Sequence, residues 1–320
     1  MKKSLFIILI LAVLLSFGAC TGEETEVTIS TTVPVTEPPT EPPAPKAGLL
    51  LRNISADDQD AISLQSVLED MGYEVLSRDA ENDQAKQNEQ ATALIADGCE
   101  VLVLQPVMVS GLETLLEQLG SVPVIVLDAQ PELDEIPDNV AILCPREEQA
   151  GTVQAALPAM LPGGGDLNGD GKVSVVMVQG PEDHMDANSR AAAFLAAVDP
   201  AVYTVLETVT GDWTVEGGKT CCRQMLSKYG PDIELIVTSG EEMALGAVEA
   251  IENGGWVPGT DMYLISVGSS TNIRTETRLG RVSGIATVDE KMRLQLLQEL
   301  ISGTLEEKTQ YVDYIPLVSQ

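Results

Sequence analysis

The sequence predicts an α/β protein built as two doubly wound parallel-sheet lobes joined by a hinge. From Gly48 onward, short runs rich in leucine and β-branched residues alternate with amphipathic stretches of helical spacing. This alternation is typical of βαβ units that form a parallel sheet. After Pro145 the same pattern starts again, and a chain of 320 residues has the length of about two such domains.

The first lobe is expected to span residues 48–144 and to regain residues 288–305 near the end of the chain. Apolar side chains at i, i+3, i+4 and i+7 predict a helix through Leu64–Met71, and Gly72 ends it. The other elements expected are strands at Leu49–Leu51, Tyr73–Leu76, Cys99–Leu104 and Val122–Leu127, and helices at Asp83–Ala96 and Gly111–Leu119.

The second lobe is expected to span residues 145–287 and to take up residues 306–320. A helix is expected at Asp289–Ile301, followed by one final strand at Tyr311–Val318. Ligands of doubly wound sheets bind beyond the carboxyl ends of the strands, so the loops there are candidate sites. The strands expected are Val173–Val178, Tyr203–Val209, Leu235–Thr238, Tyr263–Val267 and Val282–Thr287.

The N-terminus predicts export from the cytoplasm. Lys2 and Lys3 precede the apolar run Leu5–Leu15, which is too short to span a bilayer and has the length of a signal-peptide core. The sequence Ser16–Cys20 resembles a bacterial lipoprotein processing site. Residues 1–20 are therefore expected to be a lipoprotein signal peptide, with Cys20 lipidated and holding the protein to the cell membrane. An ordinary signal peptide cut nearby is the alternative.

Residues 21–47 predict a disordered linker, because a composition rich in Thr, Glu and Pro cannot bury apolar surface. A glycosylated stalk is the alternative function for this segment.

Composition and the absence of motifs exclude several classes of function. The 49 acidic and 18 basic residues give a formal charge of -31, which repels nucleic acid. His184 is the only histidine, and no phosphate-binding loop is present, so an enzyme is not expected. The internal cysteines have no metal or redox spacing and are expected to be packing residues: Cys99, Cys144, Cys221 and Cys222.

One loop has the first half of a calcium-site pattern. Asp166, Asn168 and Asp170 are each separated by one residue and Gly171 follows, so three short oxygen-bearing side chains can converge. A complete helix-loop-helix site has a bidentate glutamate where this chain has Met177, inside a predicted strand. A calcium ion here would need a carboxylate from elsewhere in the chain. A dockerin-type repeat has a similar sequence motif, but no second copy is present.

A polar segment follows the strand Val173–Val178. His184, Asp186 and Arg190 are expected at the carboxyl end of this strand and the start of the next helix. A charged acceptor and a forked donor at that place suit a polyhydroxy ligand. The alternative is an exposed polar loop with an aspartate near a helix N-terminus.

Five segments together resemble the periplasmic galactose/glucose-binding protein family, and the similarity covers nearly all of residues 48–319. They are Asn82–Gln90, Asp166–Ser174, His184–Arg190, Asp212–Thr214 and Ala244–Ile251. The resemblance implies a type I periplasmic binding protein fold. It also implies a monomer that binds a sugar between its lobes and delivers it to an ABC transporter permease.

The resemblance implies a structural calcium ion (Ca2+) completed by a carboxylate from a later strand. Glu234 matches that position, and Ser174 is shorter than the glutamine usual at its own position. The implied ligands are Asp166, Asn168, Asp170, the Lys172 backbone carbonyl, Ser174 and Glu234.

The resemblance also implies a sugar site in which Trp213 stacks on the ligand. Asp128 stands where the family has an asparagine, and Asp57 or Asp58 is in place of its first-loop aspartate, although the stacking aromatic of that loop is absent. The implied ligand-binding residues are Asp57, Asp58, Asp128, His184, Asp186, Arg190 and Trp213.

Three further polar positions of the family are lost to Gly240, Gly268 and Val288. The two glycines are expected to enlarge the cleft, so that a galactose- or glucose-like sugar or a larger relative fits. The residues expected to replace the lost groups are Glu241, Glu242, Ser269 and Ser270.

Rival functions are a binding protein that signals to a membrane receptor, a glycoside hydrolase, and a cytoplasmic sugar-responsive repressor. No convincing carboxylate pair supports the hydrolase, and the signal peptide and the lack of a DNA-binding head argue against the repressor.

Overall fold

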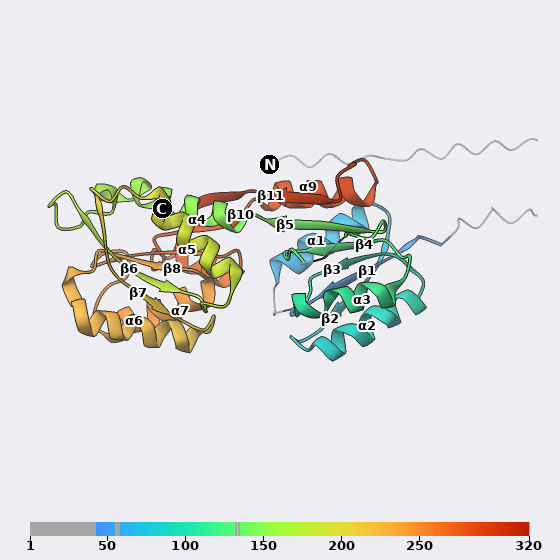
Figure 1. Ribbon diagram of the computed structural model, residues 1–320, viewed down its shortest axis with the longest axis horizontal. Coiled ribbons are helices and arrows are strands. Elements are labelled where there is room, and N and C mark those ends of the chain that lie inside the picture. Colours follow the sequence, from blue (N-terminus) through green and yellow to red (C-terminus); the bar gives the residue numbers. More distant parts are fainter. Residues whose placement is uncertain (1–42, 55–57, 132, 134, 320) are drawn as a thin grey trace, which may run out of the picture. The chain divides into compact units, whose positions relative to one another are not determined.

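The computed structural model describes residues 43–54, 58–131, 133 and 135–319. They form two six-stranded sheets, each covered by helices on both faces (Figure 1). Sheet A has the order β11-β5-β4-β3-β1-β2 and sheet B the order β12-β10-β9-β8-β6-β7. We call sheet A with its helices lobe 1 and sheet B with its helices lobe 2. The predicted fold class, two doubly wound α/β lobes, is confirmed.

Lobe 1 has an all-parallel sheet whose four central strands, β1, β3, β4 and β5, are mostly apolar, as expected for strands buried on both faces. Its strands are β1 (Lys46–Leu51), β2 (Glu74–Asp79), β3 (Cys99–Leu104), β4 (Val124–Leu127), β5 (Val140–Pro145) and β11 (Thr309–Val312). Its helices are α1 (Gln59–Asp70), α2 (Gln84–Ala96), α3 (Leu112–Leu119) and α9 (Glu290–Ile301), with a short 3₁₀ turn at Val109–Gly111.

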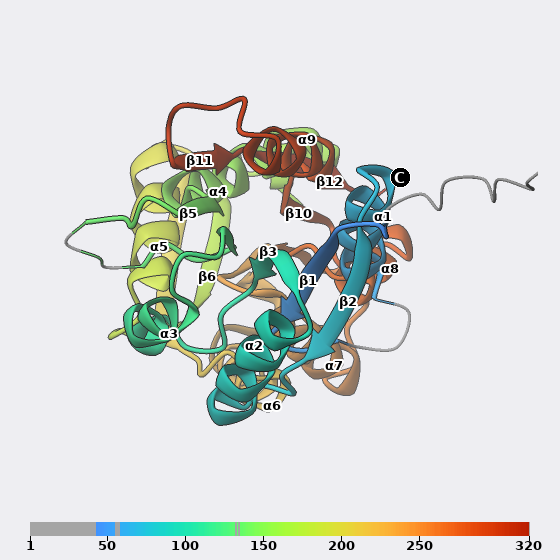
Figure 2. The same ribbon diagram turned by 90° about the vertical axis from the view of Figure 1, so that its right-hand side faces the viewer.

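The alternation of side chains along β1 divides the lobe 1 core into two layers. Leu49 and Leu51 pack with α1 and α9, whereas Leu50 points to the opposite face and packs with α2 and α3. Figure 2 shows these two pairs of helices around the strands of sheet A. Each layer therefore buries the apolar faces of two helices, α1 and α9 in one layer and α2 and α3 in the other.

Lobe 2 repeats this design, with β12 added antiparallel to β10. Its strands are β6 (Val173–Gln179), β7 (Tyr203–Thr210), β8 (Leu235–Thr238), β9 (Tyr263–Val267), β10 (Gly284–Val288) and β12 (Tyr314–Val318). Its helices are α4 (Glu147–Ala156), α5 (Met185–Ala197), α6 (Val215–Tyr229), α7 (Glu241–Asn253) and α8 (Thr271–Arg278). Short 3₁₀ turns lie at Leu157–Met160, Pro162–Gly165 and Gly230–Asp232.

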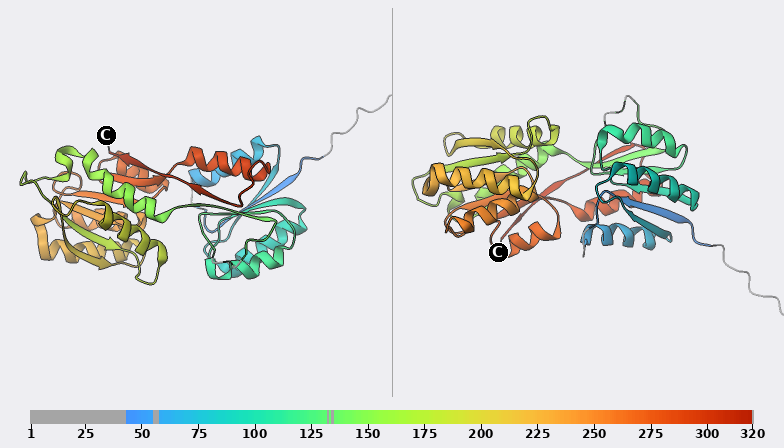
Figure 3. Two further views of the ribbon diagram at one scale, coloured as in Figure 1. Left: turned by 45° about the horizontal axis from the view of Figure 1, so that its top comes forward. Right: turned by 90° about the horizontal axis from the view of Figure 1, so that it is seen from below.

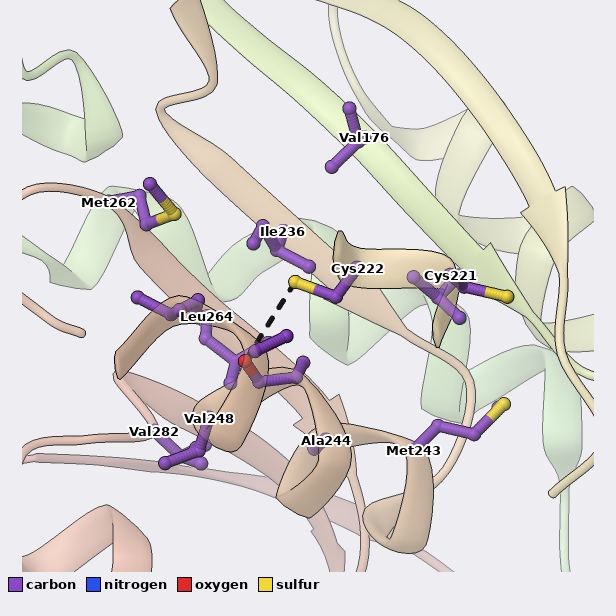
Figure 4. Close-up of a cluster of buried hydrophobic side chains, with 14 of the residues drawn as sticks. Val176, Cys221, Cys222, Ile236, Met243, Ala244, Val248, Met262, Leu264 and Val282 are labelled. Atoms are coloured by element: carbon purple, nitrogen blue, oxygen red, sulfur yellow. Dashed lines mark hydrogen bonds between the residues drawn. The ribbon is translucent and has the colours of Figure 1, made fainter. Parts of the chain in front are cut away.

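The four described cysteines are free and buried, so their prediction as packing residues is confirmed. Figure 4 shows the Cys222 sulfur directed toward Ile236 and Leu264, whereas the Cys221 sulfur points away from them. Burial raises the pKa of the Cys222 thiol to about 12. Such a thiol stays protonated and behaves as a small apolar side chain.

The chain passes between the two sheets three times, after β5 at Pro145, after β10 at Val288 and after β11 at Asp313 (Figure 3). The last crossing corrects the expected strand Tyr311–Val318. Its first part, through Val312, pairs with β5 in sheet A, and its second part pairs with β10 in sheet B. The assignment of residues 306–320 to lobe 2 was therefore wrong for β11, because a β-rich run does not reveal a change of partner strand.

The start of lobe 1 also differs from the expected boundary. Lys46 and Ala47, which were expected in the linker, pair with Glu74 and Val75 as the first residues of β1. The signal peptide, with Cys20, and linker residues 21–42 lie outside the described residues. Within the described part of the chain, no helix combines the length and apolar character needed to cross a membrane.

Gly151 lets α4 and α5 approach closely, and α5 carries Arg190. A Cβ atom at Gly151 would lie 2.2 Å from the Arg190 backbone carbonyl oxygen and 2.8 Å from the Ala193 Cβ. The sequence thus fixes the position of α5 relative to the first crossing.

Candidate functional site

The strand order reverses between β1 and β3 in sheet A and between β6 and β8 in sheet B. Helices on the two sides of such a switch point cover opposite faces of the sheet, which opens a crevice at the carboxyl ends of the strands. Gly180 follows β6, Ser239 and Gly240 follow β8, and Gln105 follows β3. The candidate site residues can therefore be placed at two such edges, one in each lobe.

Trp213 lies at the switch point of sheet B. A Cβ at Gly180 would come within 2.3 Å of the Trp213 ring, and one at Gly240 within 2.8 Å. The indole thus lies directly against the backbone that follows β6 and β8. Its Nε1 is buried and has no hydrogen-bond partner among the described residues, so packing holds the ring in place.

A local turn presents this ring. Trp213 has a positive φ of 64°, which is uncommon for a large side chain. Asp212 accepts hydrogen bonds from the Thr214 amide at 3.0 Å and from the Thr214 hydroxyl at 2.7 Å, and these bonds bracket the tryptophan. They also hold the pKa of Asp212 below its usual value. In the predicted Asp212–Thr214 segment, the two polar residues therefore stabilise the turn that presents Trp213.

The structure brings the predicted lobe 2 residues together around Trp213. The His184 and Trp213 ring centroids are 5.2 Å apart in an edge arrangement, and the Arg190 guanidinium carbon lies 5.8 Å from the Trp213 ring centre. His184 Nδ1 is 4.0 Å from the Asp186 carboxylate, and both side chains are about half exposed. The geometry groups the four side chains at one edge of sheet B.

Arg190 is held by two contacts within lobe 2. Its Nε forms an ion pair with Glu147, and one terminal nitrogen donates to the Ser239 carbonyl oxygen at 2.6 Å. Burial alone would lower the pKa of Arg190, but the charge and hydrogen bond of Glu147, together with the charges of Tyr314 and Asp186, outweigh burial and raise the pKa. Sequence reasoning missed Glu147. Its position directly after the first crossing was the available signal.

The expectation that Gly240 and Gly268 enlarge the cleft was wrong. The Trp213 ring occupies the space beside Gly240, and the Glu241 side chain lies where a Cβ on Gly268 would be, with Oε2 at 2.5 Å. Both glycines make room for a neighbouring side chain of the same lobe, and sequence alone does not reveal that neighbour.

Of the four side chains expected to replace lost polar groups, three have local partners. Glu241 accepts from the amides of Ser269 and Ser270 at 2.9 and 3.0 Å. The Ser270 hydroxyl caps α8, and the Ser269 hydroxyl lies 3.1 Å from that of Thr287. For Glu242, no hydrogen bond is found within the described residues.

In lobe 1, Asp128 follows β4 with a φ of 57°. Its Oδ2 accepts from the Gln105 side chain at 2.8 Å and from Arg293 at 3.0 Å. Two donors thus fix this carboxylate at the carboxyl edge of the strands. The second oxygen, Oδ1, has no hydrogen bond within the described residues and is available as an acceptor.

Arg293 is the centre of the lobe 1 edge, and sequence reasoning missed it. Its side chain is 5% exposed and pairs with Asp60, Asp128 and Glu290. Burial opposes its charge, but the three carboxylates raise its pKa. Burial raises the pKa of Asp60, and Arg293 opposes that rise. Arg293 is four residues before the buried Leu297 in α9, so a charged residue on the apolar helix face was the available signal.

Asp58, a predicted ligand residue, is the N-cap of α1. Its Oδ1 accepts from the amides of Asp60 and Ala61, both at 3.1 Å. A capping aspartate satisfies backbone donors at the helix start, so part of its hydrogen-bonding capacity is structural. Asp57 lies outside the described residues.

The predicted calcium loop adopts a sharply turned conformation. The side-chain oxygens of Asp166, Asn168 and Asp170 accept hydrogen bonds from backbone amides further along the loop. Gly169 and Gly171 have positive φ values of 78° and 84°. The bonds run to Asp166 from Gly169 and Gly171, to Asn168 from Asp170, and to Asp170 from Lys172.

Glu234 reaches this loop, as the resemblance implied. It is 3% exposed, and its two oxygens accept from the amides of Leu167, Asn168 and Ser174 at 2.8, 3.1 and 2.9 Å. Its carboxylate therefore ties the loop to sheet B through the backbone. Among the described residues, no group of three His, Cys, Asp or Glu side chains lies close enough together to bind a metal ion by itself. Asn168, Ser174 and backbone oxygens would have to contribute, and calcium accepts such ligands.

We expect Gly180→Ala to displace Trp213, because the added Cβ would lie 2.3 to 2.7 Å from three ring atoms. In a Trp256→Phe background, the emission of Trp213 should shift to longer wavelength as the ring moves into water. Gly111→Ala is the control, because its Cβ would meet only one atom, at 3.9 Å. Equal emission spectra for the two variants would contradict the placement of the ring.

A sequence model described as a periplasmic binding protein domain matches residues 56–300. The ribose import binding protein of Bacillus subtilis is 26% identical over 246 residues, which are 74% of this chain and 75% of that protein. The D-galactose/methyl-galactoside binding periplasmic protein of Haemophilus influenzae is 27% identical over 58% of this chain and 59% of its own length. The xylitol-binding protein of Mycolicibacterium smegmatis is 24% identical over 77% of this chain and 69% of its own length.

Solved structures share the fold. A galactofuranose binding protein superposes with a TM-score of 0.67 at 18% identity, covering 86% of this chain and 94% of that one. The binding protein of the arabinose ABC transporter from Shewanella sp. ANA-3 superposes with a TM-score of 0.68 at 18% identity, covering 85% and 91%. Because the domain model covers most of the chain and the two-lobed fold agrees with it, this chain belongs to the periplasmic binding protein family.

Proposed function

We propose that this protein is an extracytoplasmic solute-binding protein that captures a sugar between its two lobes and delivers it to an ABC transporter permease. The family membership supports the binding role, and the relatives named for ribose, galactose and xylitol support a small polyhydroxy ligand. These relatives are binding proteins, which argues against the hydrolase alternative.

The grouping of Trp213, Arg190, His184 and Asp186 at the switch point of sheet B carries this proposal. An aromatic face beside one forked donor and one carboxylate matches a sugar, whose ring has an apolar face and an edge of hydroxyl groups. Gln105, Asp128 and Asp60 supply amide and carboxylate groups at the corresponding edge of lobe 1.

The pairing of the arginines indicates a neutral ligand. Arg190 is paired with Glu147, and Arg293 is surrounded by three carboxylates. Neither cation is left to neutralise a carboxylate or phosphate on the ligand. Binding an anionic sugar at these edges would add repulsion to an already acidic surface.

The proposed mechanism is hinge closure about the three crossings at Pro145, Val288 and Asp313. A sugar that contacts both lobes stabilises the closed form by its differential affinity, and the permease would recognise that form. The anchor would be the lipidated Cys20, with the segment between Cys20 and the start of β1 as the tether, and the protein would act as a monomer.

Signalling to a membrane receptor is the second candidate function. A solved complex of the TorS sensor domain with TorT contains a chain of the same fold, with a TM-score of 0.68 at 16% identity. Stimulation of a reconstituted permease by the sugar-loaded protein would favour transport, whereas binding to a sensor domain alone would favour signalling.

A thermal-shift screen of neutral monosaccharides, polyols and their acidic derivatives tests the proposed function. We expect a neutral sugar or polyol to raise the melting temperature and to change Trp213 emission in the Trp256→Phe background, because the ring lies at the proposed site. Matched sugar acids should give no shift. A screen in which only acids bind, or in which no sugar or polyol binds, would overturn the proposal.

We further propose that calcium binds the loop Asp166–Ser174 with Glu234. The residue types fit, because the set offers three carboxylates, one amide, one hydroxyl and the Lys172 carbonyl, all oxygen donors of the kind calcium prefers. The bonds from Glu234 to three loop amides support the closeness of the two segments. The ion would stiffen the loop of lobe 2 and would not touch the sugar.

Chelation should lower the melting temperature of the wild-type protein, because an ion bound only to the native state stabilises it. Asp170→Ala should abolish this sensitivity to chelator. Asp261→Ala is the matched control, since it also removes an exposed aspartate from a turn. The Asp261 carboxylate accepts a hydrogen bond from the Val257 amide at 2.6 Å. Identical melting curves for the wild-type protein with calcium and with chelator would contradict the proposed calcium site.

A further inference from the structure

Arg190 has one group left for a ligand. Its Nε is paired with Glu147 and its Nη1 donates to the Ser239 carbonyl, but Nη2 has no acceptor among the described residues. The side chain is only 15% exposed, so it cannot turn freely. The direction in which Nη2 points is therefore set by Glu147 and Ser239.

Glu147 is itself held by the hinge. It is the first residue of α4, directly after the first crossing, and it is 18% exposed. The Tyr314 hydroxyl lies 3.3 and 3.4 Å from its two carboxylate oxygens. Tyr314 is the first residue of β12, directly after the third crossing, and it is 6% exposed. Burial, followed by the charge of Glu147, raises the pKa of the Tyr314 hydroxyl, so it remains a donor at neutral pH.

The same cluster includes all three crossings. Gln149, also in the first turn of α4, donates to the Asp313 carboxylate at 3.3 Å and accepts from the Tyr314 amide at 2.9 Å. The Asp289 amide, at the second crossing, donates to the Asp313 carbonyl oxygen at 2.8 Å. Arg190 is thus linked to the first crossing through Glu147 and to the third through Glu147 and Tyr314, and a backbone hydrogen bond joins the third crossing to the second.

We propose that Glu147 and Tyr314 are positioning residues that couple the ligand contact of Arg190 to the hinge. This inference rests on the proposed function only in that Arg190 contacts the sugar. Glu147 and Tyr314 both belong to lobe 2, where Tyr314 pairs with Val288 and packs with Ala150 of α4, and they lie where the first and third crossings enter that lobe. A backbone change at either crossing would alter the Tyr314–Glu147 contact. The orientation of Arg190 therefore differs between hinge conformations, and a ligand that fixes Arg190 favours one of them.

Tyr314→Phe tests the coupling, because it removes one hydroxyl and leaves the ring. Tyr263→Phe is the matched control: Tyr263 is also 6% exposed and in lobe 2, but its hydroxyl donates to the Pro162 carbonyl oxygen at 3.2 Å. Dye labels at Glu113→Cys in α3 and Glu216→Cys in α6 report the distance between lobes, since both positions are exposed and the four cysteines of the described residues are buried. The labelled protein starts after Cys20, so that this residue takes no dye.

In the sugar-free protein, we expect Tyr314→Phe to change the distribution of energy transfer between the labels and Tyr263→Phe to leave it as in the wild type. Glu147→Gln should also change Trp213 emission in an unlabelled Trp256→Phe background, because the Arg190 guanidinium lies 5.8 Å from that ring. With the sugar found by the screen, Tyr314→Phe should weaken binding by about two- to tenfold, and Tyr263→Phe should not.

The coupling is overturned if Tyr314→Phe matches Tyr263→Phe in both the sugar-free distribution and the affinity for the sugar. This result would leave the proposed function intact, because wild-type closure on sugar is measured in the same assay. Conversely, a wild-type protein that binds no sugar would contradict the proposed function, while the sugar-free distributions would still decide the coupling.

Discussion

The buried ion pair between Arg190 and Glu147 is the interaction on which the proposed site depends. It fixes a charged donor beside Trp213 and joins that donor to the hinge through Tyr314. Removing one partner of such a pair would leave an uncompensated charge, at a cost of about 3–5 kcal/mol. Lobe 1 has a similar arrangement, in which Arg293 of α9, just after the second crossing, holds Asp60 and Asp128 at the edge of sheet A. In both lobes, an arginine connects the strand ends to a crossing, and it is ion-paired with one carboxylate in lobe 2 and with three in lobe 1.

The second constraint is the absence of side chains at Gly180 and Gly240. The ring of Trp213 lies against the backbone at both positions, and the Asp212–Thr214 bonds hold the positive φ that presents it. An aromatic surface therefore lies where side chains at positions 180 and 240 would otherwise be. Selection of a ligand there would depend on shape and on the few groups that have no hydrogen-bond partner among the described residues, such as Arg190 Nη2 and Asp128 Oδ1, more than on many hydrogen bonds.

The fold could be predicted because it follows from local patterns. Apolar runs and helical spacing located most strands and helices, and the restart after Pro145 predicted the second lobe. What could not be predicted depends on contacts distant in sequence. The change of sheet at Asp313, the pairing of Arg293 with Asp60, and the space filled beside Gly240 and Gly268 each involve a partner that no local pattern specifies. The closeness of Glu234 to the loop Asp166–Ser174 was predicted only because a family resemblance supplied the long-range pairing.

The central claim is that one sugar is bound at the switch points of both sheets. A crystal structure of the protein with the sugar identified by screening tests this most directly. We predict electron density for a sugar whose apolar face lies on Trp213, with hydroxyl groups bonded to Arg190 Nη2 and to Asp128 Oδ1. A sugar bound to one lobe alone, or away from Trp213 and Arg190, would contradict the account.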